Sequence, residues 1–207
     1  MAAPLLARYV EPRLEAALGD TPVVLIHGPR QCGKTTLARM VGERLGYTYD
    51  SDSLRKNLEY YDQRTSHGST LSFVAHAALL AEIDLKSSWE RFMVALESDV
   101  SDVQGGTTAE GIHLGVMAGT LDIIQRFYLG ERVNDGVLHF NPKPVSNLAG
   151  LSMPLVFRGT PLDVALDGGK VRVTVRPGGF TPSLKVGVGD VVKDIKSGQT
   201  HVFDTEQ

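Results

Sequence analysis

The sequence has little of what marks secreted, membrane or nucleic-acid-binding proteins. Its 207 residues include one cysteine, Cys32, so an internal disulfide is excluded. No apolar run is long enough to cross a bilayer, and the first residues do not have the pattern of a signal peptide. The formal net charge is -3, so no broad basic surface is indicated. We therefore expect a cytoplasmic protein that binds neither nucleic acid nor membrane.

A phosphate-binding loop near the start is the most specific local motif. Residues 28–35 read Gly-Pro-Arg-Gln-Cys-Gly-Lys-Thr, a pattern whose backbone N–H groups surround a phosphate. A short β-branched run, Val23 to His27, precedes the loop, and helical spacing continues from Thr35 to Leu45. Gly46 stands where a helix-ending glycine belongs. These patterns predict a buried strand, a phosphate loop and a helix.

ATP and Mg²⁺ are the ligands that such a loop suggests. Lys34 would reach the terminal phosphates and Thr35 would hold the metal. The predicted nucleotide-binding residues are Gly28, Gly33, Lys34, Thr35 and Thr36. The alternative is a glycine-rich turn that only imitates the motif. Hydrolysis also needs an acidic residue after a second apolar strand, and no credible candidate follows, so the loop predicts binding at most.

Beyond about residue 57 the sequence changes to helices and then to short strands. Capping-box chemistry at Ser87-Ser88-Trp89-Glu90 predicts the start of the second helix. Turn signals at 134–136 and 167–169 predict β-hairpins in a small antiparallel sandwich. Three apolar stripes at helical spacing predict helices that face a core: Leu71, Val74, Ala75, Ala78 and Leu79; Trp89, Phe92, Met93 and Leu96; and Ile112, Val116, Thr120, Ile123 and Phe127.

Two of these helix starts carry groups suited to an anion. Hydroxyl residues at 65–70 precede the first helix, where free backbone N–H groups favour negative charge. Spacing alone favours the simpler interpretation, in which Ser69 or Thr70 only caps the helix. At the third helix, His113 is more often structural than catalytic, and Glu110 is explained as an acid in the first turn.

The two parts of the chain resemble two different families. Residues from about 5 to 53, above all Gly-Pro-Arg-Gln-x-Gly-Lys-Thr-Thr-Leu, resemble the N-terminus of a family of bacterial AAA-type ATPases. Residues from about 57 to 207 resemble glycoside hydrolase family 65, which contains trehalose, maltose and kojibiose phosphorylases and some hydrolases. The similar segments are Tyr60 to Ser72, Asp102 to Thr120, Leu138 to Pro142 and Leu155 to Gly159.

This second resemblance implies a fold and a phosphate site. The family fold is an (α/α)₆ barrel followed by a β-sandwich. The expected fold is therefore mixed α and β: a β-P-loop-α fragment at 1–53, helices of a partial (α/α)₆ barrel at 57–130 and a small antiparallel β-sandwich at 131–207. Family phosphorylases take orthophosphate as co-substrate, and the residues that would hold it fall on Ser69, Thr70 and His113. Gly68 and Leu121 depart from the family pattern.

No catalytic residue is predicted. Inverting phosphorolysis needs a carboxylic acid to protonate the glycosidic oxygen, and the resemblance implies that this glutamate lies in barrel helices that the chain does not contain. Neither Glu59 nor Glu110 matches its position.

Three functional hypotheses follow. The chain is the C-terminal fragment of a family 65 phosphorylase or hydrolase, fused to a P-loop segment and without efficient catalysis alone. Alternatively it is an ATP-binding protein of the AAA type, or a non-functional fusion remnant. A disaccharide or a sugar phosphate is the expected partner. Exposed barrel helices without their neighbours predict self-association.

Overall fold

The computed structural model describes residues 8–29, 31–47, 50–106, 108–148 and 150–205, without the side chain of Ser51. The chain divides into two compact units, residues 1–57 and 58–207. No helix among the described residues is long and apolar enough to span a membrane.

The first unit is built on two helices, α1 (Glu11–Asp20) and α2 (Lys34–Arg44). Leu14, Leu37 and Val41 form its small buried core. The Arg44 guanidinium lies 3.1 Å from the Glu11 carboxylate and so joins the two helices. The helix predicted after the glycine-rich loop is thus confirmed. Gly46 follows its end with a φ of 80°, a backbone conformation that favours glycine.

The strand predicted at residues 23–27 is wrong. This segment is extended, but no strand in the described part of the chain pairs with it. Its side chains still alternate: Val24 and Ile26 are half-buried against the helices, whereas Val23 and Leu25 are more than 80% exposed. The β-branched pattern therefore produced an extended backbone, but a β-strand also needs a neighbour for its hydrogen bonds.

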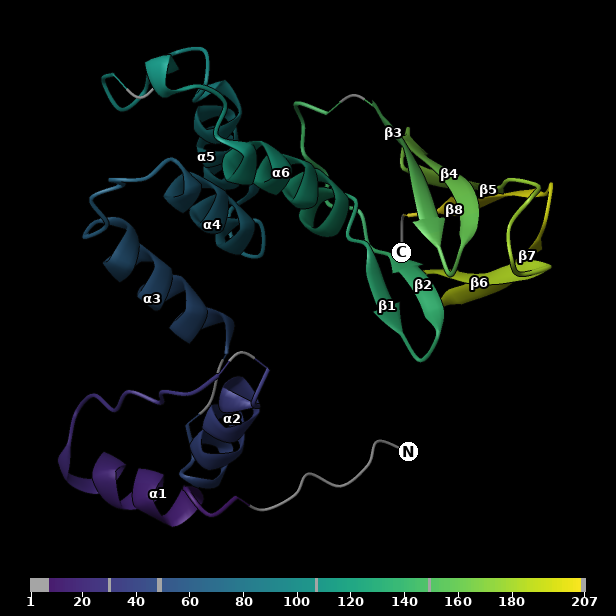
Figure 1. Ribbon diagram of the computed structural model, residues 1–207. Coiled ribbons are helices and arrows are strands. Elements are labelled where there is room, and N and C mark those ends of the chain that lie inside the picture. The colour runs from purple at the N-terminus through teal and green to yellow at the C-terminus, as the bar shows by residue number, and fades with distance from the viewer. Residues whose placement is uncertain (1–7, 30, 48–49, 107, 149, 206–207) are drawn as a thin grey trace. The chain divides into compact units, whose positions relative to one another are not determined.

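Helices make up the first half of the second unit (Figure 1). The helix α3 (Ser51–Asp62) ends in this unit. It is followed by α4 (Leu71–Leu80), α5 (Leu85–Glu97), the 3₁₀ turn η1 (Thr108–Glu110), α6 (Leu114–Asp122) and the π-helix η2 (Ile123–Tyr128).

The three predicted apolar stripes are confirmed only in part. Ala77, Phe92, Ile123 and Tyr128 form much of the buried helical core. Hydrogen bonds of one buried side chain link three elements of this core. The Ser88 hydroxyl donates to the Ala77 carbonyl at 2.7 Å and lies 3.1 Å from the Tyr128 hydroxyl. Residues predicted for the core but exposed instead are Leu71, Ala75, Leu79, Leu96 and Ile112.

The predicted start of the second helix is also wrong. The helix α5 begins at Leu85, and Asp84 is its N-cap. The Asp84 carboxylate accepts hydrogen bonds from the backbone N–H groups of Lys86 and Ser87, each at 3.1 Å. The Ser87 hydroxyl also donates to Asp84 at 2.7 Å, so the serine supports the Asp84 cap and the helix begins almost one turn earlier.

A close contact joins α4 and α6. A Cβ atom built on Gly119 would lie 2.5 Å from a methyl group of Val74, too close for any real side chain. Both helices run in the same direction in Figure 1, from the loops at the left toward the sandwich. The glycine therefore allows two parallel helices to approach each other and sets their starts on the same side.

Two four-stranded sheets form the second half of this unit. One has the order β1-β2-β6-β7 and the other β3-β4-β5-β8, and apolar side chains from both fill one core. The strands are β1 (Arg132–Asn134), β2 (Val137–Phe140), β3 (Gly150–Phe157), β4 (Thr160–Asp167), β5 (Lys170–Val175), β6 (Ser183–Val188), β7 (Val191–Lys196) and β8 (Thr200–Asp204).

Both predicted hairpins are present in this sandwich. Asp135 and Gly136 form the two-residue turn between β1 and β2, and both have positive φ, as a type I′ turn requires. Residues 168–169 make the corresponding turn between β4 and β5. The sandwich is not wholly antiparallel, because β2 pairs with β6 in parallel.

We predict that Gly119→Ala destabilises the chain by about 1–3 kcal/mol, the usual cost of overpacking, because the stiff Val74 side chain has little room to yield. Urea unfolding followed by circular dichroism measures this change. Gly115→Ala is the control, since no atom of the described residues outside its own helix lies within 4 Å of its Cβ position. That control should gain up to about 1 kcal/mol from helix propensity. Equal gains for both variants would contradict the close contact.

Candidate phosphate site

Two loops that precede parallel helices meet in the second unit. The first, residues 63–70, leads into α4, and the second, residues 98–113, leads into α6. The side-chain amide of Gln104 in the second loop donates a 2.7 Å hydrogen bond to the backbone carbonyl of His67 in the first. Since Val74 packs on Gly119 just beyond, the starts of the two helices belong to one neighbourhood.

His113 is held in one orientation by Asp99. One carboxylate oxygen of Asp99 lies 2.5 Å from the His113 Nδ1 atom, and the other accepts the His113 backbone N–H at 2.9 Å. The carboxylate can only accept when ionised, so Nδ1 carries the hydrogen. Within the described residues, Nε2 has no hydrogen-bond partner and is the free end of the ring.

The same pair of hydrogen bonds affects Asp99. The bond from the His113 side chain lowers the pKa of the Asp99 carboxyl below its ordinary value of 3.8, and the backbone bond acts in the same direction. Partial burial opposes this shift without reversing it. Asp99 therefore stays ionised near neutral pH and remains available to support the ring.

The two hydroxyl residues of the first loop differ in environment. Ser69 is exposed, and its Oγ accepts the backbone N–H of Leu71 at 3.3 Å, which is a weak form of the capping interaction. Thr70 is buried, and its side chain makes no capping hydrogen bond. Capping therefore accounts for part of the role of Ser69, and Thr70 is a site candidate without a cap function.

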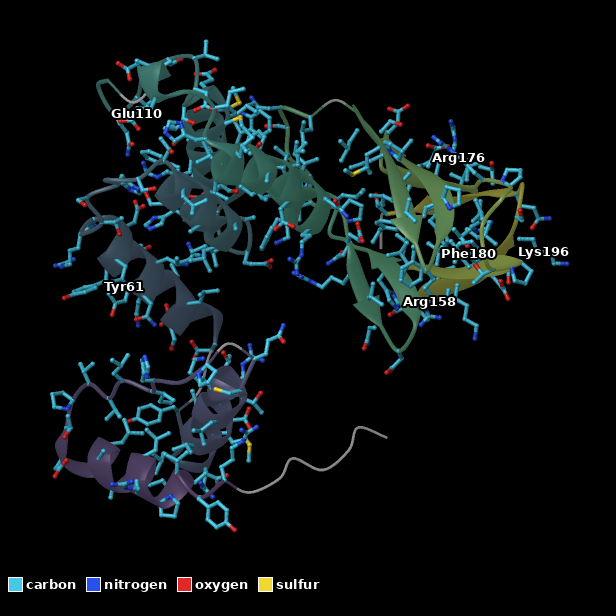
Figure 2. All side chains as sticks on the ribbon, viewed as in Figure 1. Tyr61, Glu110, Arg158, Arg176, Phe180 and Lys196 are labelled. Atoms are coloured by element: carbon cyan, nitrogen blue, oxygen red, sulfur yellow. The ribbon has the colours of Figure 1, made fainter. Side chains whose placement is uncertain are left out.

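The third helix does not begin where the sequence predicted. The carboxylate of Asp102 accepts the backbone N–H groups of Gly106 and Thr108 and shapes the loop, while Thr107 lies outside the described residues. Glu110 is exposed on η1 (Figure 2), and α6 starts four residues later with His113 as its N-cap. Glu110 is thus not a first-turn acid of α6.

Sequence reasoning missed Asp99 and Gln104, which fix these two loops. Asp99 is 14 residues from His113, and no helical or strand period relates the two. An acidic residue after the preceding helix was the only signal, and many such residues are simply solvated.

The predicted nucleotide loop does not present its lysine to a phosphate. The Lys34 ammonium donates to the carbonyls of Gly28 at 3.0 Å and Pro29 at 2.6 Å, so it is engaged by its own loop. Gly33 has a φ of 78°, Thr35 is exposed and Thr36 is half-buried. Arg30 lies outside the described residues. No strand in the described part of the chain pairs with residues 23–27, so this loop is not anchored in a sheet there.

Comparisons with known proteins identify the family. The model of the glycosyl hydrolase family 65 central catalytic domain matches residues 25–122, and the model of the family's C-terminal domain matches residues 132–190. Together the two matches cover most of the chain, in the order expected for the family. The chain belongs to glycosyl hydrolase family 65.

Several relatives are similar over most of this chain. An uncharacterised glycosyl hydrolase of Mycobacterium tuberculosis is 39% identical over 76% of the chain, which spans 12% of that protein. The trehalose 6-phosphate phosphorylase of Lactococcus lactis is 31% identical over 83% of the chain and 22% of its own length. The kojibiose phosphorylase of Escherichia coli is 29% identical over 81% of the chain and 22% of its own length.

A solved structure shares the fold. It is described as a "putative kojibiose phosphorylase" from the human microbiome, and it has a TM-score of 0.62 at 22% identity. The similarity covers 82% of this chain and 22% of that one. The chain thus spans between about one eighth and about one fifth of the length of these relatives.

These comparisons correct the interpretation of the first unit. The match to the catalytic domain begins at residue 25, inside the segment that resembles an AAA-type ATPase. Neither the family matches nor the relatives support a P-loop ATPase segment, ATP or Mg²⁺. The ATP-binding interpretation of the glycine-rich sequence is therefore unsupported by these comparisons.

We predict that Asp99→Asn destabilises the chain in a pH-dependent way. Since the pKa of Asp99 is lowered on folding, its contribution is present above the ordinary value of 3.8 and is lost as the pH falls through the lower, folded value. Urea unfolding should show the variant less stable than the parent at about pH 6, with the difference shrinking at about pH 2. A difference that does not depend on pH would contradict the charged interaction.

Proposed function

We propose that this chain carries the orthophosphate-binding part of a family 65 disaccharide phosphorylase. His113, Ser69 and Thr70 are the residues assigned to phosphate. The observation that supports this assignment best is the orientation of His113, whose Nδ1 side is occupied by Asp99 and whose Nε2 side is free among the described residues.

The chemistry of these groups suits an oxyanion. A protonated His113 would donate from Nε2 to a phosphate oxygen, and the Asp99 carboxylate would stabilise the positive charge of the ring. The exposed hydroxyl of Ser69 would add a neutral donor. Phosphate held in this way would be oriented as the nucleophile that replaces water in glycoside cleavage.

The rest of the reaction is not assigned to residues of this chain. Cleavage needs a general acid on the opposite face of the sugar, and neither Glu59 nor Glu110 is proposed for this role. Glu110 lies in the second loop and is exposed on η1. The proposal therefore covers phosphate binding and a sugar partner of the disaccharide class. The sugar class is taken from the names of the relatives. It includes no nucleotide.

We predict that His113→Ala weakens orthophosphate binding by about tenfold or more, the effect of losing one hydrogen bond to a charged group. Broadening of the phosphate ³¹P NMR signal during a titration measures the affinity, with a chelator present to exclude metal-bound phosphate.

His27→Ala is the matched control for this measurement, because His27 is an exposed histidine of the first unit. It should bind phosphate as the parent does. Unchanged phosphate affinity in His113→Ala would refute the assignment. A parent chain that binds no phosphate at millimolar concentration would refute it as well.

We further propose that the chain associates with itself through α4 and α6. Leu71 and Leu79 on α4 and Leu114 and Leu121 on α6 are each at least 45% exposed, and in each pair the two residues share one helix face. Apolar faces of this kind are usually covered.

Sedimentation velocity should show concentration-dependent dimers or larger species. The double variant Leu79→Lys with Leu121→Lys should shift the chain toward monomer. Val156→Lys, at a comparably exposed apolar site on β3, should not. A parent chain that is monomeric at all concentrations would overturn this proposal.

A further inference from the structure

A second polar cluster includes one residue of the first loop and shares no proposed ligand with the phosphate site. It consists of Asp62 at the end of α3, His67 in the loop and His76 on α4. One ligand atom from each residue lies within 4.8 Å of the others. All three side chains are at most 27% exposed, so the cluster is largely shielded from solvent.

The hydrogen bonds around His67 determine which nitrogen carries its hydrogen. The Ser72 hydroxyl donates its only hydrogen to the Ser69 carbonyl at 2.7 Å. It can therefore only accept at the 2.8 Å contact with His67 Nδ1, and Nδ1 must be the donor. In the neutral ring, Nε2 then presents a lone pair.

No hydrogen-bond donor among the described residues reaches that lone pair. The Nε2 atom of His67 is buried, has no hydrogen-bond partner among the described residues and lies 4.0 Å from the Asp62 Oδ1 atom. Burial lowers the pKa of His67, and the nearby His76 and Arg91 lower it further against the opposing effect of Asp62. The buried lone pair and the Asp62 Oδ1 atom are thus two potential ligands for a metal ion that lie close together.

His76 faces the same carboxylate oxygen. Its Nδ1 atom lies 2.7 Å from Asp62 Oδ1. Its Nε2 atom is 3.5 Å from the Thr65 hydroxyl, whose hydrogen is donated to the Tyr61 carbonyl. Thr65 can therefore only accept from His76 Nε2. The Nδ1 atom donates to the Asp62 carboxylate in this structure, so a metal would replace the Nδ1 hydrogen.

We propose that Asp62, His67 and His76 bind a divalent transition-metal ion of the zinc class. Two imidazole nitrogens and one carboxylate oxygen suit Zn²⁺, whereas Mg²⁺ and Ca²⁺ prefer oxygen ligands. Tetrahedral bonds of about 2.0 Å place ligand atoms about 3.3 Å apart. The contacts of 2.7 Å and 4.0 Å each need to change by less than about 1 Å to reach that geometry.

The surroundings of the cluster match what metal ligands usually have. Each histidine donates its second N–H to a hydroxyl, Ser72 or Thr65, which holds the ring in place. Arg91 lies 2.8 Å from Asp62 Oδ2 and orients the carboxylate so that Oδ1 faces the histidines. Its charge also weakens attraction for a cation, so we expect a site less tight than a structural zinc centre.

The ion would fix the loop that carries Ser69 and Thr70. Asp62 precedes residues 63–70 and His76 follows them, so a shared cation closes the base of the loop. Three protein ligands leave a fourth position for water. The metal measurements below use no phosphate, so their outcome does not depend on the proposed function.

The test uses the full chain without an affinity tag, stripped with a chelator and titrated with Co²⁺ as an optical probe. One equivalent should bind with the visible absorption of four-coordinate Co²⁺, Zn²⁺ should displace it, and millimolar Mg²⁺ should not. A parent chain without saturable uptake, or displacement by Mg²⁺, would overturn the proposal.

Variants assign the ligands. His67→Gln and His76→Gln should each weaken Zn²⁺ binding by at least about tenfold, and His27→Gln, at an exposed histidine of the first unit, should bind as the parent does. Ser72→Ala keeps all three ligands but removes the acceptor for His67, and it should weaken binding by about tenfold. If a histidine variant fails to fold, the Ser72→Ala result tests whether His67 is a ligand. Unchanged binding in Ser72→Ala and in every variant that folds would refute the site.

Discussion

The packing of Val74 on Gly119 is the contact on which the second unit depends. It allows α4 and α6 to run side by side with almost no side chain between them at that point. Parallel neighbours place their N-terminal ends together, and the loops at those ends carry every residue of the candidate phosphate site. The helix α5 connects them and contributes the buried residues Ser88 and Phe92. A small backbone-level constraint thus decides where the chemistry of the chain is gathered.

The same arrangement explains why the apolar patterns of the helices were misleading in detail. A helix in a helical barrel packs on neighbours at both sides, so its apolar surface is wider than one stripe. In this chain, Ala77 and Val74 face α5 and α6, whereas Leu71 and Leu79 have no cover among the described residues. The sequence pattern therefore marked apolar positions correctly but could not tell which of them would be covered.

Local chemistry made some elements predictable, and long-range partners made others unpredictable. The Asp135-Gly136 turn follows from backbone preferences of the two residues themselves, so the hairpin was predictable. The segment 23–27 failed because strand formation requires a partner that no local pattern reveals. For the site, a family resemblance directed attention to His113, but nothing near it in sequence indicated Asp99. The parallel pairing of β2 with β6 was not predicted for the same reason, since the paired residues are over forty residues apart in the sequence.

The two histidines of the neighbouring loops show how second partners decide what a ring can bind. His113 Nδ1–H is held by a carboxylate, which can share a positive charge, so its free nitrogen suits an anion. His67 Nδ1–H is held by a neutral hydroxyl, and burial disfavours its charged form, so its free nitrogen keeps a lone pair that suits a cation. The rings are chemically identical, and both present Nε2. Their opposite preferences follow from the groups behind them, so the phosphate and metal proposals can be tested by changing Asp99 or Ser72 without touching either ring.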